Sequence, residues 1–304
     1  RSDTALRQLA TDYARALREN ADASNLAFTA LRARRLDLPF RLATALNDDT
    51  AAALSAWAGE QAGAPVYSGH GVSGRQVWLF TGQGSHWRTM GHAMCQRSKV
   101  FADTLERCFS ACREMLTPSL RDAMFNPDSA QLEEMTWAQP AIVAFEIAMA
   151  AHWRAEGLQP DYAIGHSVGE FAAAVVCGHY TIEQVMPLVC RRGALMQLCA
   201  NGAMVAVFAQ EEALMPLARQ FELDLAANNG TRHTVFSGPE ARIAEFCAAL
   251  SQRDISYRRL SVSGAAHSAL LEPILDRFQD ACAGLHAEPG QLQLISTLTA
   301  GAID

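Results

Sequence analysis

The sequence predicts an α/β protein with a parallel sheet, an inserted smaller subdomain and a separate N-terminal unit. Three observations support this: short apolar runs that end in glycine-rich loops, apolar helical runs between them, and a different alternation of strands and helices after residue 202. Of the 304 residues, 50% are hydrophobic and 19% are charged, so the chain can bury a sizeable core.

Residues 1–74 are expected to form a small α/β unit. Apolar positions at helical spacing follow Ser2, a strand-like run covers 40–46, and a helix is expected over 50–58. The glycine-rich stretch 69–74 is expected to be a linker that ends this unit.

Residues 75–202 and 263–304 are expected to form the larger subdomain, whose strands run into loops and helices. Proline suits a first helical turn, so an apolar helix is expected to begin at Gln139-Pro140. This order predicts a parallel sheet that is covered by helices on both faces, with a site at the carboxyl ends of its strands. The expected strands are 76–80, 162–164 and 291–299, and the expected helices are 100–115, 140–153, 170–176 and 182–198.

The motif Gly165-His166-Ser167-Val168-Gly169 lies between an expected strand and an expected helix. A G-x-S-x-G sequence in this setting builds the nucleophile elbow of an α/β-hydrolase-like subdomain, where glycines permit the sharp turn. The helix that follows directs its N-terminal N–H groups toward the serine. The pattern therefore predicts a reactive Ser167.

The inserted subdomain is expected over residues 203–262, which read strand, helix, strand, strand, helix, strand. This order is the ferredoxin-like split βαβ plan. Ser167 and His267 lie on opposite sides of the insertion, so we expect the substrate in a cleft between the two subdomains. The six expected elements are 204–209, 211–221, 223–227, 233–237, 241–252 and 256–262.

A serine hydroxyl needs a neighbouring base to become a nucleophile, and His267 is the candidate base. It is expected at the end of the last strand of the insertion, among small residues that leave room for the ring. His166 is expected to point away from the serine and to make a structural hydrogen bond.

Acyl chemistry also needs N–H donors for the oxyanion of the tetrahedral intermediate. Val168 follows the nucleophile and supplies one candidate N–H. The loop Gly82-Gln83-Gly84 follows the first strand of the sheet and offers the Gln83 N–H, although the same residues would also suit a simple tight turn.

Two adjacent arginines, Arg191 and Arg192, fall in an otherwise apolar helical run. One of them must face inward or extend its charge to solvent, and an inward guanidinium prefers a carboxylate in bidentate geometry. From the residues alone, an internal ion pair is favoured over a carboxylated substrate.

Composition excludes several other classes of protein. The net charge of −7 argues against nucleic-acid binding, and neither an apolar stretch of membrane-spanning length nor a signal-peptide pattern is present, so a cytoplasmic location is expected. The eight cysteines form no C-x-x-C pair, which favours reduced thiols over a metal site.

Several segments together resemble one family. They are Leu79 to Ser85, Gly165 to Glu170, Arg192 to Gln197, Gly202 to Met204, and the pair His267-Ser268. Over residues 77–299 the chain resembles the acyltransferase domains of modular polyketide synthases and the related malonyl-CoA:acyl-carrier-protein transacylases. Residues 1–74 resemble the linker that joins ketosynthase to acyltransferase in such synthases.

The resemblance implies roles for five residues. Ser167 would be the acylated nucleophile, His267 its general base and acid, and Gln83 and Val168 the backbone donors to the oxyanion. Arg192 would bind the carboxylate of the extender unit, which reverses the preference for an internal ion pair.

The resemblance also implies a ping-pong cycle in polyketide biosynthesis. Ser167 would take the acyl group from an acyl-CoA and pass it to the phosphopantetheine thiol of an acyl carrier protein. The implied partners are that carrier protein and a neighbouring ketosynthase domain, and no bound cofactor or metal is implied.

The specificity motif departs from the family pattern. Malonyl-selective members usually carry His-Ala-Phe-His and methylmalonyl-selective members Tyr-Ala-Ser-His, where this chain has Gly264, Ala265, Ala266 and His267. Ala266 leaves volume for a larger unit, but Val168 is the type common in malonyl enzymes, so malonyl is favoured over methylmalonyl or another extender. His86 replaces the usual glutamine of the family.

One further expectation concerns the end of the chain, and two alternative functions remain open. Family domains continue beyond the strand at 296–301, and a backbone carbonyl there usually orients the histidine, so this chain is expected to be truncated at its C-terminus. An inactive structural fragment is therefore one alternative. A serine hydrolase or thioesterase is another, with Asp224 or Asp254 as the acid of its triad.

Overall fold

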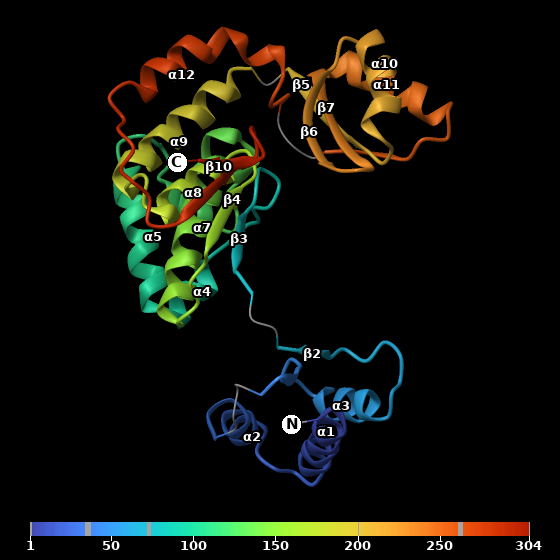
Figure 1. The fold of residues 1–304 in the computed structure, drawn as a ribbon. Coiled ribbons are helices and arrows are strands. Elements are labelled where there is room, and N and C mark those ends of the chain that lie inside the picture. The colour runs from blue at the N-terminus through green and yellow to red at the C-terminus, as the bar shows by residue number, and fades with distance from the viewer. Residues whose placement is uncertain (1, 34–37, 72–73, 200, 261–263, 304) are drawn as a thin grey trace. The chain divides into compact units, whose positions relative to one another are not determined.

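The computed structural model describes residues 2–33, 38–71, 74–199, 201–260 and 264–303. The chain divides into two compact units, Arg1–Gly74 and Arg75–Asp304, which we describe separately (Figure 1). No helix in the described ranges combines the length and the apolar character needed to cross a membrane.

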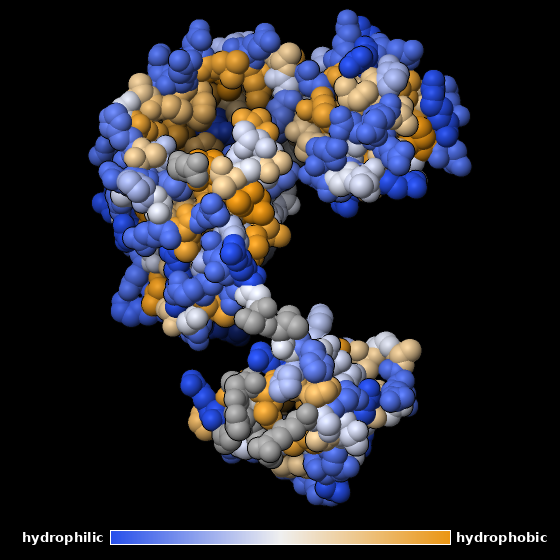
Figure 2. Space-filling view, in the orientation of Figure 1, coloured by the Kyte–Doolittle hydropathy of each residue, from blue (hydrophilic) through white to orange (hydrophobic). Residues whose placement is uncertain are grey.

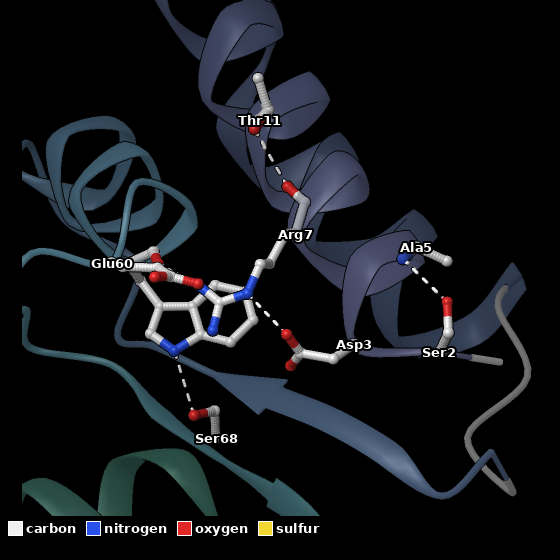
Figure 3. A network of polar contacts seen from close by, with 8 residues as sticks. Ser2, Asp3, Ala5, Arg7, Thr11, Glu60 and Ser68 are labelled. Atoms are coloured by element: carbon white, nitrogen blue, oxygen red, sulfur yellow. Dashed lines mark hydrogen bonds and ion pairs between the residues drawn. The ribbon is translucent and has the colours of Figure 1, made fainter.

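The first unit packs its helices around the buried side chains of Ala10, Ala14 and Leu54. Arg7 donates to Asp3 at 2.6 Å and to the Trp57 carbonyl at 2.9 Å, and its guanidinium lies 4.7 Å from the centre of the Trp57 ring (Figure 3). The elements are α1 (Asp3–Arg18), α2 (Ala23–Phe28), η1 (Thr29–Ala33), β1 (Phe40–Ala43), α3 (Thr50–Ala58) and β2 (Tyr67–His70).

The prediction that residues 69–74 form a linker is wrong for the first two of these residues. Gly69 and His70 belong to β2 and pair with Arg41 and Phe40 of β1. The ring centroids of Phe40 and His70 lie 4.1 Å apart, and a cross-strand aromatic pair of this kind stabilises the pairing of two strands. This contact between residues 30 positions apart is not evident in the sequence, where the glycines favour a loop. Residues 72–73 lie outside the described ranges.

The second unit contains a four-stranded sheet in the order β10-β9-β4-β3. The strands β3 (Val77–Phe80), β4 (Tyr162–Gly165) and β9 (Gln293–Ser296) are parallel, and β10 (Gly301–Ile303) is antiparallel to β9. The α/β fold predicted from the sequence is confirmed, with one antiparallel edge strand added.

The two faces of this sheet differ. Phe80, Ala163 and Leu294 are buried against the helical layer, whereas Leu79 on the opposite face of β3 is 73% exposed. Orange surface over β3 is visible in Figure 2. The expectation of helices on both faces is therefore wrong at β3, because the strand alternates in the manner of a sheet covered on one face.

The helical layer centres on α7 (Met135–Ala155), which packs against α5 (Lys99–Ala111), α8 (Gly169–Cys177) and α9 (Ile182–Gln197). The shorter elements of this layer are α4 (His92–Arg97), α6 (Leu120–Phe125), η2 (Gln131–Glu133), η3 (Ala269–Ile274) and α12 (Leu275–Cys282).

The α7 helix begins five residues before Pro140, so the expected start at Gln139-Pro140 is wrong. The cause is a tertiary contact, because the Met135 N–H donates to Gln197 Oε1 of α9 at 2.8 Å and so gains a partner at the helix start. Gly193 permits this approach, since a Cβ there would lie 2.4 Å from the Met135 carbonyl oxygen.

The inserted subdomain is an antiparallel sheet in the order β6-β7-β5-β8, which is the strand order of the ferredoxin-like plan. Along β5, Val205 packs toward the helices, whereas Met204 and Ala206 face the other way and pack with Leu260 and Ala266. Figure 1 shows the elements β5 (Gly202–Val207), α10 (Glu211–Gln220), β6 (Asp224–Gly230), β7 (His233–Pro239) and α11 (Glu240–Ser251), and β8 (Tyr257–Arg259) follows them.

Candidate active site

The turn that carries Ser167 is tight on both sides. Ser167 has a φ of 52°, in the left-handed region. A Cβ on Gly165 would lie 2.3 Å from the Glu170 nitrogen, and a Cβ on Gly169 would lie 2.5 Å from the Thr81 carbonyl oxygen. Both positions therefore require glycine, and the strained serine projects from the end of β4 as a nucleophile elbow requires.

The structure brings Ser167 and His267 together, with 2.8 Å between Oγ and Nε2. His267 does not end a strand as expected, because β8 stops at Arg259 and the histidine lies in the following loop with a φ of 58°. The Ser268 hydroxyl donates to the Ala265 carbonyl at 2.8 Å and closes the turn that holds the ring.

The pKa of His267 is lowered, first by desolvation of the ring and then by the positive charge of Arg192 and by His166, while Glu170 opposes the shift. His267 lines the cleft and is an exposed residue by solvent accessibility. A lowered pKa keeps the imidazole neutral near pH 7, the form that can accept a proton from serine.

Neither aspartate considered as a triad acid is bonded to His267 within the described residues. Asp224 instead accepts the Ala269 N–H at 2.8 Å, and Asp254 lies in the turn after α11 with a φ of 55°. The geometry therefore presents a serine and histidine pair rather than a complete triad of side chains.

Arg192 faces inward from α9, whereas Arg191 is exposed. Its Nη1 donates to Gln139 Oε1 at 2.5 Å, and its guanidinium lies 5.8 Å from the centre of the Phe171 ring. Burial lowers the pKa of Arg192 to about 10, and Glu170 opposes this shift. The guanidinium is thus charged at neutral pH and oriented by an amide.

The internal ion pair that the residues alone favoured is not found among the described side chains. A neutral amide orients Arg192 and leaves its positive charge without a bonded carboxylate. Gln139 itself was missed in the sequence, although a fully buried polar residue in an apolar helix could have indicated it.

Most of the predicted site residues line a cleft of about 230 Å³ between the elbow and α9 of the large subdomain and the face of the inserted sheet that carries Met204 and Ala206, whereas Val168 and Ala265 do not line it. Apolar side chains form most of its wall on the inserted side, and Asn229 and His233 are the polar residues there. The lining residues include Gln83, His166, Ser167, Arg192, Met204, Ala206, Val235, Gly264, Ala266 and His267.

Two expectations about neighbouring residues need correction. His166 lines the same cleft rather than pointing away from it, and its Nδ1 lies 2.6 Å from the position that a Cβ on Gly82 would take. Ala265 does not line the cleft, since it is buried and its Cβ lies 2.3 Å from the position of a Cβ on Gly202. Of the proposed specificity residues, Gly264 and Ala266 face the cleft.

Two backbone donors remain available at the site. The N–H groups of Gly169 and Glu170 are bonded to the carbonyls of His166 and Ser167. Across the described ranges no acceptor is bonded to the N–H of Val168, nor to that of Gln83, which lines the cleft. These two N–H groups could therefore serve an oxyanion.

The cysteines and the acidic groups provide no second centre in the described part of the chain. All eight cysteines are free, with the sulfur atoms of Cys112 and Cys190 3.3 Å apart in the core. No group of histidine, cysteine, aspartate or glutamate side chains in the same ranges has the arrangement of a metal site.

Comparison with known proteins places this geometry in a family. A family model described as acyl transferase domain matches residues 77–303. The chain is 37% identical over 255 residues to mycoketide-CoA synthase of Mycobacterium tuberculosis, covering 83% of the chain and 6% of that protein. It is 38% identical over 239 residues to the phenolphthiocerol synthesis polyketide synthase Pks15/1 of Mycobacterium marinum, covering 78% of the chain and 11% of that protein.

Solved structures agree with the family model. The acyltransferase domain from module 8 of the salinomycin polyketide synthase has a TM-score of 0.88 at 30% identity, covering 99% of this chain and 73% of that one. A malonyl CoA-acyl carrier protein transacylase from Burkholderia pseudomallei has a TM-score of 0.67 at 28% identity, covering 76% and 79%. The chain, which spans a small part of the length of the synthases it matches, belongs to the acyl transferase domain family of polyketide synthases.

Proposed function

We propose that this domain loads an extender unit, malonyl in preference to methylmalonyl, from its CoA thioester onto an acyl carrier protein through an acyl-Ser167 intermediate. The observation that carries the proposal is the 2.8 Å contact between Ser167 Oγ and His267 Nε2 in a cleft that also holds Arg192. A nucleophile, a base and a cation for a carboxylate are thus within one site.

In the first half-reaction, neutral His267 takes the proton of Ser167 as Oγ attacks the thioester carbonyl carbon. The N–H groups of Gln83 and Val168 stabilise the oxyanion that forms. When the carbon–sulfur bond breaks, the imidazolium returns its proton to the departing coenzyme A thiolate, and an acyl-serine ester remains.

The second half-reaction reverses these steps with a different thiol. The phosphopantetheine thiol of the carrier protein gives its proton to His267 and attacks the ester carbonyl. The serine oxygen leaves and takes the proton back, so the enzyme ends in its starting state. Serine and histidine supply all the proton transfers, and the proposed cycle uses no bound cofactor.

Arg192 would bind the free carboxylate of the extender unit. Its guanidinium is already oriented by Gln139 and is partly desolvated, so a carboxylate that pairs with it gains a charge-assisted interaction in a medium of low polarity. The cation favours any carboxylated extender unit over a plain acyl group. The preference for malonyl over methylmalonyl rests on Val168 beside the nucleophile, while the small Ala266 is the feature that favours a larger unit.

The wider context is also a proposal. Residues 1–74 would serve as the linker between a ketosynthase and this acyltransferase, which is consistent with their separation as a compact unit. Residues 75–202 and 263–304 would form the large subdomain and residues 203–262 the ferredoxin-like one. The partners would then be a ketosynthase domain and the carrier protein that receives the acyl group.

Intact-mass measurement after incubation with malonyl-CoA tests the proposal. The expected result is a malonyl increment that the Ser167→Ala variant lacks. Rapid release of free malonate without an increment would instead favour a serine hydrolase or thioesterase, and neither increment nor turnover would favour an inactive structural fragment.

A further inference from the structure

The proposed acyl transfer assigns no role to the buried carboxyl group of Glu146. Glu146 lies on α7 and lines a second cavity of about 510 Å³. Its Oε2 atom is enclosed and has no hydrogen-bond partner in the described ranges, and desolvation raises the pKa of the carboxyl to about 7. Burial disfavours the charged form of a carboxyl group, and a buried polar atom without a hydrogen-bond partner is uncommon, so the position of Glu146 calls for a functional or structural explanation.

The other carboxyl oxygen of Glu146 holds the start of the Gly82-Gln83-Gly84 loop. Glu146 Oε1 accepts the Thr81 N–H at 2.5 Å and the Thr81 hydroxyl at 2.7 Å. Thr81 directly follows β3, so these two bonds tie the first residue of the loop to the central helix.

Ser85 ties the loop together at its far end. Its Oγ lies 2.8 Å from Thr81 Oγ1, and its hydroxyl donates to the Gly82 carbonyl at 2.9 Å. In a trans peptide the C=O and the following N–H point in opposite directions. The bond that fixes the Gly82 carbonyl therefore also fixes the direction of the Gln83 N–H.

The loop has little freedom on its other side. A Cβ on Gly82 would lie 2.6 Å from His166 Nδ1, and a Cβ on Gly169 would lie 2.5 Å from the Thr81 carbonyl oxygen, so the loop backbone packs directly on the nucleophile elbow. A rotation at Thr81 would therefore move the Gln83 N–H relative to Ser167.

We propose that Glu146 is a positioning residue, which acts through Thr81 and Ser85 to direct the Gln83 N–H at the oxyanion. The inference rests on the proposed function, in which that N–H stabilises the tetrahedral intermediate. The neutral carboxyl is the active form, because a negative charge behind the loop would oppose the negative charge that develops on the substrate.

The surroundings of Glu146 support this assignment. Glu146 is the one titratable group among the described residues that line its cavity, and the other side chains that β3, the loop and α7 contribute to it are uncharged. No neighbouring cation there would stabilise the carboxylate, so the ionisation of Glu146 is set by desolvation and by the two Thr81 bonds.

Steady-state kinetics of malonyl transfer across pH test the proposal. Glu146→Ala should lower kcat by about tenfold or more with little change in KM, since an oxyanion donor is misdirected while substrate binding remains. Glu146→Gln should keep most of the kcat that Glu146→Ala loses, because the amide oxygen of glutamine can accept hydrogen bonds from both the N–H and the hydroxyl of Thr81. The wild type should show a decline of kcat above pH 7, and Glu146→Gln should remove that decline.

Matched variants distinguish a positioning role of Glu146 from an unspecific loss of structure. Thr81→Val should resemble Glu146→Ala, whereas Thr81→Ser keeps the hydroxyl and should stay near the wild type. Glu156→Gln alters an exposed carboxyl next to the C-terminus of the same helix and serves as the control. An unchanged kcat in Glu146→Ala, or an alkaline decline that persists in Glu146→Gln, would overturn the proposal.

A measurement without substrate keeps the inference separate from the proposed function. The amide resonance of Gln83 in ¹⁵N-labelled protein should shift with a midpoint near pH 7 in the wild type, and that transition should vanish in Glu146→Gln. A Gln83 resonance that responds neither to pH in this range nor to Glu146→Ala contradicts the inference even in an active enzyme. Failure of the wild type to load malonyl contradicts the proposed function alone.

Discussion

Replacing Arg192 with alanine should lower kcat/KM for carboxylated acyl-CoA substrates much more than for acyl-CoA substrates without a carboxylate. The guanidinium is oriented by Gln139 and partly desolvated, so the bond it would make to a malonyl carboxylate belongs to the stronger, charge-assisted class. Hydrogen bonds to charged groups contribute about 1.5–3 kcal/mol, which corresponds to roughly a tenfold to a hundredfold change in kcat/KM. Acetyl-CoA has no carboxylate and should lose much less.

The assay is the rate of coenzyme A release with malonyl-CoA and with acetyl-CoA, measured for both Arg192→Ala and Arg191→Ala. Arg191 is adjacent in sequence but exposed, so its removal controls for the loss of one positive charge on α9. Equal losses for the two substrates in Arg192→Ala, or an Arg191→Ala variant that behaves in the same way, would refute the assigned role.

Three further predictions concern the base, the cleft wall and the helical layer. Because the pKa of His267 is lowered, the rate of acylation with malonyl-CoA should rise with pH through a midpoint below 6.5, and a midpoint above that value would contradict the desolvated site. Ala266→Phe should lower kcat/KM for methylmalonyl-CoA more than for malonyl-CoA, because the ring takes volume from a cleft of about 230 Å³, and equal effects would contradict its place in the wall. Gln197→Ala removes the acceptor of the Met135 N–H and should cost about 1 kcal/mol of unfolding free energy in urea, whereas an unchanged midpoint would contradict the capping contact.

Elements whose signals are local could be predicted from the sequence. The α3 helix follows the expected range over Thr50–Ala58, and α9 differs by one residue from the expected end, since a capping box at Thr181 and Gln184 marks its start. The elbow motif likewise lies between the strand and the helix that its glycines require.

Features that depend on distant contacts could not be predicted. The start of α7 depends on Gln197, which is far away in the sequence, and the strand at Gly69 depends on pairing with β1. At the site, the sequence indicated Ser167, His267 and Arg192 but neither Gln139 nor Glu146. Both are polar residues in an apolar helix, and their partners become evident only when the helices and the loop are packed.

The most direct test of the account is the site of acylation. After a brief exposure of the chain to malonyl-CoA, acid quenching and proteolysis, mass spectrometry should find the malonyl group on the peptide that contains Ser167, as an ester on that residue. The label should disappear in His267→Ala, because the hydroxyl then lacks its base. A malonyl group on any other residue, or labelling of Ser167 that persists at the same rate without His267, would contradict the account.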